Sequence, residues 1–254
     1  ARPADAGADF DRELDGARLR NVNWEVVSDD ESHVTFRRAL PQWDLEVFKT
    51  FRLAKVTPEE AKNPDAPAYH LAFDIEFRNT GKAARKLVYY VDGPNSLPTE
   101  GWWYASKVGR DWGAAGLRDV IVSFQGDTHA ISAVTIGQGK SEPLQRAQPI
   151  SYVGVDAQYF DVLMIPQRPD PAEVWFSQWQ PLHYGAVATD LPQLTNTSFR
   201  VTSTLRDLKP GAAMQEKALV FAGPKRPELL AVDDLGDVIT YGWFGPVAKL
   251  LFHF

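Results

Sequence analysis

The chain contains no cysteine among its 254 residues. Disulfide bonds, thiolate metal sites and a cysteine nucleophile are therefore excluded, whereas the cellular compartment stays open. Basic side chains are also outnumbered, because the chain has 27 Lys and Arg against 33 Asp and Glu and a net charge of -6. They are scattered along the sequence and form no basic stripe. Neutralising phosphates requires clustered cations, so nucleic acid is not an expected partner.

Long apolar runs and recognisable catalytic motifs are missing as well. No stretch reaches the roughly 18 consecutive apolar residues of a membrane span. Asp74 and Glu76 share a strand face and suit acid–base chemistry on sugars, but the wet face of an amphipathic strand is the favoured interpretation. No metal site is expected, because metal-ligand spacing is absent among the histidines, which are His33, His70, His129, His183 and His253.

Alternating apolar and polar residues predict about a dozen strands and hardly any helix before residue 224. The odd-numbered residues from Leu45 to Leu53 share one face, as do those from Leu71 to Phe77. A turn at 80–82 predicts a hairpin with residues 86–92. Further strands are predicted at 24–28, 33–40, 119–124, 130–136, 150–157, 158–166, 173–179, 197–208 and 214–223.

This pattern predicts a mainly β protein, a sandwich over residues 22–223. A polar leader over residues 1–21 precedes it and is expected to be flexible. Helical spacing takes over in residues 224–254. The stretch PKRPELLAVDDLG, residues 224–236, begins with proline and stops at Gly236, which predicts a short helix.

The last residues predict a second, strongly amphipathic helix over 243–254. With about 12 residues it is roughly 18 Å long and cannot cross a bilayer core of roughly 30 Å. It must pack on the domain's own core or lie at a membrane interface, and composition leaves both open. Its apolar face consists of Trp243, Phe244, Val247, Leu250, Leu251 and Phe254, with Lys249 off that face.

A long irregular segment over residues 93–117 carries several aromatic residues that are candidates for exposure on a loop. Long loops in compact domains are often functional, and such rings stack on sugars or hold apolar peptides. They also serve simply to cap the open end of a sandwich, which is the favoured interpretation here. The aromatic residues concerned are Trp102, Trp103, Tyr104 and Trp112. Trp175 and Trp179, four residues apart on one strand face, are expected in the core.

Three stretches, in order and at matching spacing, resemble the large periplasmic domain of the YidC family of bacterial membrane protein insertases. They are YVGVDAQYF at 152–160, LVFAGPKRPELL at 219–230 and ITYGWFGPVAKLLFHF at 239–254. The resemblance implies a β-supersandwich of the mutarotase-like type with two short C-terminal helices. It also implies that 243–254 is the interfacial helix, with Lys249 reaching toward lipid phosphate.

The same resemblance implies a location at the bacterial inner membrane, facing the periplasm. The parent protein would insert and fold membrane proteins, with or without the Sec translocon. Expected partners are the lipid interface, the translocon and its accessory subunits, and nascent membrane proteins. The domain itself is expected to be a non-enzymatic scaffold without catalytic residues or cofactor. A carbohydrate-binding module or carbohydrate-active enzyme is the alternative.

Overall fold

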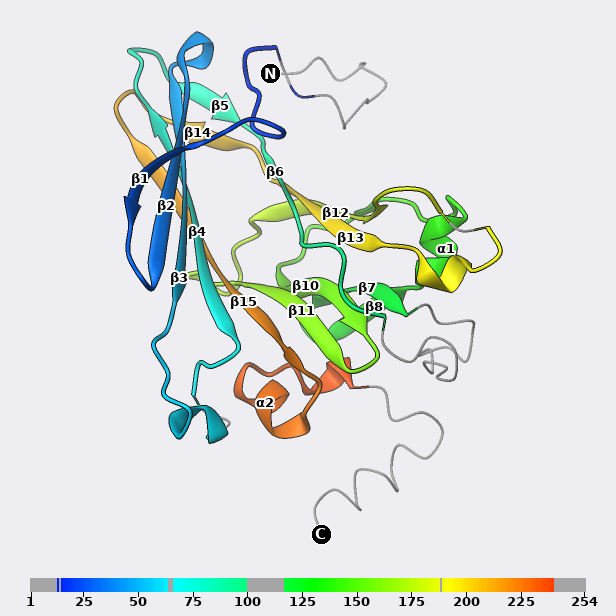
Figure 1. Ribbon diagram of the computed structural model, residues 1–254. Helices are drawn as coiled ribbons and strands as arrows, with labels where there is room; N and C mark the ends of the chain where they lie inside the picture. Colours follow the sequence, from blue (N-terminus) through cyan, green and yellow to red (C-terminus); the bar gives the residue numbers. More distant parts are fainter. Residues whose placement is uncertain (1–12, 14, 64–65, 100–116, 188, 240–254) are drawn as a thin grey trace.

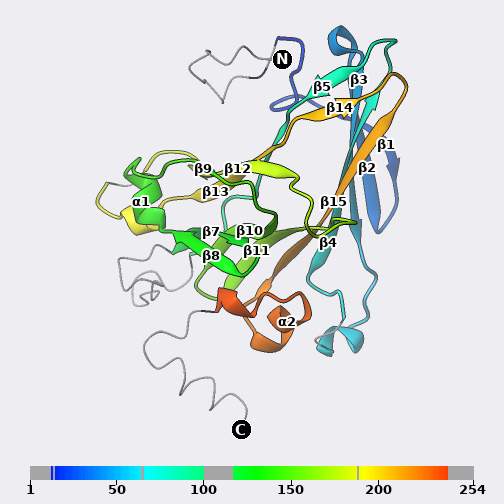
Figure 2. The same cartoon turned by 180° about the vertical axis from the view of Figure 1, so that it is seen from behind.

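The computed structural model describes residues 13, 15–63, 66–99, 117–187 and 189–239, and it consists mainly of β-sheets packed face to face (Figures 1 and 2). Among the described strands, every pairing is antiparallel. The large sheet has nine strands. In spatial order they are β1 (Glu25–Asp29), β2 (His33–Leu40), β3 (Leu45–Leu53), β4 (His70–Asn79), β15 (Ala213–Pro224), β11 (Phe160–Pro166), β10 (Ile150–Ala157), β7 (Arg118–Phe124) and β8 (Asp127–Ile131).

Two smaller sheets complete the described β-structure. The four-stranded sheet runs in the order β6 (Tyr90–Asp92), β13 (Thr197–Ser203), β12 (Phe176–His183) and β9 (Leu144–Gln145). A two-stranded ribbon pairs β14 (Arg206–Leu208) with β5 (Arg85–Leu87). The four-stranded sheet lies opposite β7, β10 and β11, whereas β1, β2 and β3 stand at the other side of the molecule (Figures 1 and 2).

Helical segments are short and few in the described part of the chain. They are α1 (Ala133–Gly137) and α2 (Pro227–Val232), with single 3-10 turns η1 (Pro41–Trp43), η2 (Glu60–Lys62), η3 (Pro192–Leu194) and η4 (Gly236–Val238). None of these helices has the length and apolar character that crossing a bilayer requires.

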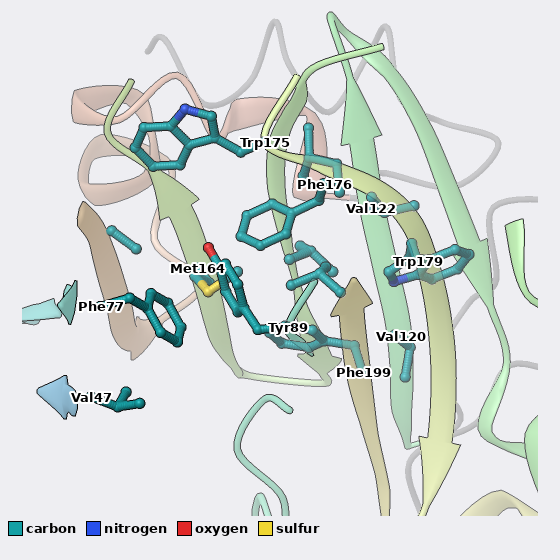
Figure 3. Packing of buried hydrophobic residues seen from close by; sticks show 14 of the residues in the cluster. Val47, Phe77, Tyr89, Val120, Val122, Met164, Trp175, Phe176, Trp179 and Phe199 are labelled. Carbon is teal, nitrogen blue, oxygen red and sulfur yellow. The ribbon is translucent and has the colours of Figure 1, made fainter. Parts of the chain in front are cut away.

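The main core fills the space between the large sheet and the four-stranded sheet. Figure 3 shows Tyr89 and Phe176 between the strands of the two sheets, beside Phe77 of β4. The Phe77 and Tyr89 ring centroids are 4.6 Å apart. Trp175 and Trp179 are 5% and 1% exposed, so their predicted place in the core is confirmed.

A second core lies on the outer face of the large sheet, where α2 and η4 pack. Leu229 and Leu230 of α2 are buried there. They contact a surface formed by side chains of four neighbouring strands, Ile121, Tyr152, Leu163 and Phe221. The helix begins with Pro227 at a position where its missing N–H costs nothing. The predicted helix over 224–236 is therefore present, in a shorter form.

Two of the predicted strand arrangements are wrong. Residues 86–92 do not form a hairpin with β4, because β4 pairs with β3 and β15. The segment instead crosses to the smaller sheets as β5 and β6. Residues 130–136 are not one strand either, since the chain turns into α1 at Ala133. There the Ser132 side chain caps the helix by accepting a hydrogen bond from the Thr135 N–H.

Part of the predicted leader lies against the sandwich. Ala17 and Leu19 pack against the main core. Two indole N–H groups, of Trp24 and Trp43, donate to the carbonyls of Leu19 and Asp15 at 3.1 Å each. Residues 15–21 are thus held in place, whereas residues 1–12 and 14 of the predicted flexible leader lie outside the described residues.

Candidate functional site

Both groups of residues that the sequence singles out lie outside the described residues. These are the interfacial residues Trp243, Phe244, Val247, Lys249, Leu250, Leu251 and Phe254, and the aromatic residues Trp102, Trp103, Tyr104 and Trp112. The structure does describe the chain on either side of the aromatic segment. Leu97 and Leu117 are buried, and the Leu117 N–H donates to the Gln193 carbonyl at 3.0 Å.

An apolar groove opens between the large sheet and the four-stranded sheet. It is shallow, because the space inside it that a water-sized molecule could occupy is only about 10 Å³. Phe73 and Ile75 of β4 line one side, with Met164 of β11 nearby, and Tyr89 and Phe176 line the other. Pockets that take small molecules are typically apolar with a few polar groups. The groove has this composition, because one buried carboxylate, that of Glu216, lies in its lining.

Glu216 is held from two sides by hydrogen bonds. The Tyr89 hydroxyl donates to Oε2. Arg206 donates from Nη2 to Oε1 at 2.8 Å, and its Nη1 reaches Glu173 Oε1 at 3.1 Å. Burial raises the pKa of the Glu216 carboxyl above its ordinary value, even though these hydrogen bonds favour the charged form. Burial and the neighbouring carboxylate also raise the pKa of the Tyr89 hydroxyl.

This cluster is built to join strands. A general acid or base must reach the proton of a bound substrate, but both oxygens of Glu216 already accept hydrogen bonds from the protein. The carboxylate links β15 to β14 and to the residue just before β6. Glu216 is not among the site residues predicted from the sequence. Its signal was an acidic residue on the apolar face of an alternating strand, between Met214 and Ala218.

The carboxylates Asp74 and Glu76 lie on the outer face of the large sheet, away from the groove. Asp74 is 5% exposed, so its assignment to a wet face is wrong. Its Oδ2 accepts hydrogen bonds from both Arg52 Nη atoms at 2.8 Å and from Gln215. Among the described residues, no group of three or more His, Asp or Glu side chains is arranged to hold a metal ion.

The chain just before α2 is tied to the large sheet by a lysine. Asp119, Asp156 and Asp161 lie side by side on β7, β10 and β11, as the strand register shows. The Lys225 ammonium pairs with Asp156 and lies 3.8 Å from Asp161 Oδ1. Opposite charges so close and so well buried resist separation. The Gly-Pro-Lys stretch therefore fixes where the polypeptide leaves β15.

Two further contacts hold the segment after α2. His70 Nε2 of β4 lies 2.6 Å from Asp233 Oδ2, and the Tyr152 hydroxyl donates to Asp237 Oδ1 at 2.8 Å. Together with buried Leu235 and Val238, these contacts fix the chain as far as Ile239. The predicted interfacial residues thus follow a rigidly docked segment at one end of the sandwich (Figure 1).

A protein-family model for the YidC periplasmic domain matches residues 64–254, well over half of the chain. The chain belongs to this family. Two of the stretches on which the resemblance was based have clear structural places. YVGVDAQYF forms most of β10 and its turn into β11, and LVFAGPKRPELL forms the end of β15 and most of α2.

One solved structure shows the same fold for this YidC periplasmic domain, and others are reported for comparison. A galactose mutarotase related enzyme from Lactobacillus acidophilus superposes with a TM-score of 0.51 at 11% identity, covering 80% of this chain and 72% of that one. A galactose mutarotase-like protein from Clostridium acetobutylicum gives 0.46 at 8% identity, covering 80% and 67%. No curated protein sequence matches the chain. The prediction of a mutarotase-like β-sandwich is confirmed.

Such low identities show the fold alone, because one fold supports many unrelated functions. The periplasmic domain family places the chain outside the cytoplasm. The mutarotase likeness brings no catalytic residue with it. In this chain the groove between the two sheets carries the Tyr89–Glu216–Arg206 cluster, whose side chains are bound to one another.

Proposed function

We propose that this domain is the non-catalytic periplasmic scaffold of an insertase that inserts and folds proteins of the bacterial inner membrane. The observation that supports it is the family match over residues 64–254. The chemistry of the described residues agrees, because the buried carboxylate of the groove is bound on both oxygens. The domain thus acts by position and by docking, and the insertion step belongs to other parts of the parent protein.

The proposal gives the C-terminal residues the task of positioning the domain on the bilayer. Residues 243–254 lie along the lipid interface with Trp243, Leu250 and Leu251 facing the acyl chains, while Lys249 reaches the phosphates. Docked α2 and η4 support this task, because they hold the chain firmly up to Ile239. The Sec translocon, its accessory subunits and nascent membrane proteins are the proposed protein partners, with Trp102, Trp103, Tyr104 and Trp112 as candidate contacts.

Vesicle sedimentation tests the membrane task. The chain should co-sediment with vesicles of phosphatidylethanolamine and phosphatidylglycerol, and deletion of residues 240–254 should abolish this. Leu250→Ser with Leu251→Ser should weaken it strongly, because two anchoring side chains are lost. Val232→Ser is the matched control, since Val232 is an apolar residue of α2 that is 43% exposed. Equal sedimentation of all variants contradicts the proposal.

The location and the absence of catalysis are tested separately. In cells producing the full-length parent, protease added to spheroplasts should cleave the domain, and protease added to sealed inverted vesicles should not. Polarimetry with galactose and a glycan-binding panel test the carbohydrate alternative. Mutarotation above the uncatalysed rate, or sugar binding lost on mutation of the groove, would replace the scaffold proposal with an enzymatic or carbohydrate-binding one.

A further inference from the structure

Two cations lie together on the inner face of the large sheet, the face that carries the main core. Arg38 of β2 is opposite Val47, and Lys49 of β3 is opposite Phe36, so the two side chains are diagonal neighbours across these strands. Both are half-buried. In the part of the chain that the structure describes, neither forms an ion pair with a carboxylate. We call Arg38 and Lys49 the cation pair.

The arginines on the outer face of β2, β3 and β4 are paired, by contrast. They are Arg37, Arg52 and Arg78, and each contacts a carboxylate at 2.8 Å or less. A half-buried cation without a counter-ion has given up part of its hydration with no compensating partner. The cation pair therefore indicates a place for an anion that another molecule supplies.

The charged ends of the cation pair are held against protein. Long cationic side chains often cover apolar surface and keep their charge in water, but here Arg38 Nε is buried and has no hydrogen-bond partner among the described residues. Arg38 Nη1 reaches only the Asn23 carbonyl, at 3.4 Å. Lys49 Nζ lies 3.9 Å from the centroid of the Trp24 ring, and burial lowers the pKa of its ammonium. A ring attracts a cation without neutralising its charge.

Apolar side chains continue from the cation pair toward the β1–β2 turn (Figure 1). We call Val34, Phe36, Phe51 and Leu53 the apolar strip. Val34 lies opposite Phe51, and the Phe36 and Phe51 rings meet edge-on at 6.3 Å. Leu53 is 57% exposed, and the other three are half-buried. The strip reaches four residues beyond Lys49 along β3, which is roughly 13 Å.

We propose that the cation pair and the apolar strip bind one single-chain carboxylate amphiphile, a fatty acid of about ten carbons whose extended chain matches the strip in length. The guanidinium fork of Arg38 fits a carboxylate, and the Lys49 ammonium adds a second charge. The alkyl chain then removes apolar surface of the strip from water. This inference goes beyond the proposed function, because it requires neither a bilayer nor a client protein.

The other charges around this face set the direction of the ligand. Asp29 lies opposite Val34 at the far end of the strip, where Glu31 also pairs with Lys55. Glu216 of β15, on the same face of the sheet, already accepts hydrogen bonds on both oxygens. A carboxylate head is therefore attracted to the cation pair and repelled from the opposite end, so the apolar chain points toward the β1–β2 turn.

Isothermal titration calorimetry of the whole 254-residue chain with decanoate tests the inference. One decanoate should bind per chain. Decanol should bind at least about tenfold more weakly, because its hydroxyl carries no charge for the cation pair to attract. Hexanoate should also bind about tenfold more weakly or less, because four methylenes lose their contact with the strip.

Substitutions locate the ligand on the sheet. Lys49→Met keeps the length of the side chain and should weaken decanoate binding about tenfold, as should Arg38→Gln, whereas Lys49→Arg should retain most of it. Lys140→Met, at an exposed lysine after α1, is the matched control and should bind as the parent does. Leu53→Ser should weaken binding about threefold. Its control is Leu205→Ser, since Leu205 is also 57% exposed and lies outside the strip.

Several results would overturn the inference. They are absent decanoate binding, equal affinity for decanol, and equal losses in Lys49→Met and Lys140→Met. Loss of vesicle sedimentation in Lys49→Met would show that the cation pair contacts a bilayer, which also overturns it. The three ligands are compared on the parent chain, so the test remains decisive if a variant fails to fold by circular dichroism. The titration contains no membrane, so its failure leaves the proposed function standing.

Discussion

The docking of α2 on the large sheet provides a sharp test of the fold. Leu230 is 0% exposed and packs on the outer face together with Leu163 and Phe221. Leu230→Ala removes this side chain and leaves a cavity against a sheet that cannot easily collapse. Buried Leu to Ala changes cost roughly 2–5 kcal/mol. Because neighbouring strands hold the opposing side chains in place, we expect about 3 kcal/mol.

Urea unfolding measures the free-energy cost and thermal unfolding measures Tm, both followed by tryptophan fluorescence and circular dichroism. For a domain of this size each kcal/mol lowers Tm by about 2–4 °C, so Leu230→Ala should lower Tm by about 6–12 °C. Val232→Ala on the same helix is the control. Val232 is 43% exposed, and its truncation should change stability by less than about 0.5 kcal/mol.

The reasoning has a clear point of failure. If Leu230→Ala unfolds within about 0.5 kcal/mol of the parent chain, α2 separates from the sheet at no cost. The segment up to Ile239 would then not be rigidly placed, and the support that it lends to an interfacial tail would disappear. A loss of equal size in both alanine variants would show that burial of Leu230 in the second core is not its cause, and helix propensity could not explain it because Ala is the best helix former.

Two further predictions concern the strands. Gly154→Ala should destabilise the chain by about 2–3 kcal/mol or more in urea unfolding, because an added Cβ would lie 2.1 Å from the Val162 carbonyl oxygen; Gly236→Ala, with open space around it, should be nearly neutral. Burial raises the pKa of Glu216, so the stability that it contributes is complete below the unfolded-state pKa and declines as pH rises through the folded-state pKa. Glu216→Gln cannot ionise, and its unfolding free energy should fall less than the parent's between about pH 4 and about pH 8; equal slopes for the two chains contradict this assignment.

Alternation in the sequence was enough to find most strands and their faces. The predicted strand over 33–40 coincides with β2, and the predicted faces of β3 and β4 are those of the inner and outer sheet surfaces. Alternation does not show which strands pair with one another in the sheet. The turn at 80–82 therefore predicts a hairpin, whereas β5 pairs with β14, which is distant in sequence, and not with β4. The short helix α1 was missed because its residues, Ala133 to Gly137, are mostly β-branched or small.

The candidate site was less accessible from sequence for a physical reason. Glu216 is important only because Tyr89 and Arg206, far apart along the chain, meet it in three dimensions. Aromatic and interfacial residues were recognisable from composition and resemblance, and their roles remain predictions.

Strand β15 lies in the middle of the large sheet, between β4 and β11. It leads directly into α2 and the C-terminal residues, so any pull exerted from that end would travel along a strand that is hydrogen-bonded on both edges. Those bonds run across the direction of pull and would have to shear together instead of opening one after another. A domain tethered at this end would therefore tolerate mechanical load. Under such a load α2 would detach from the outer face of the sheet before the hydrogen bonds of β15 break.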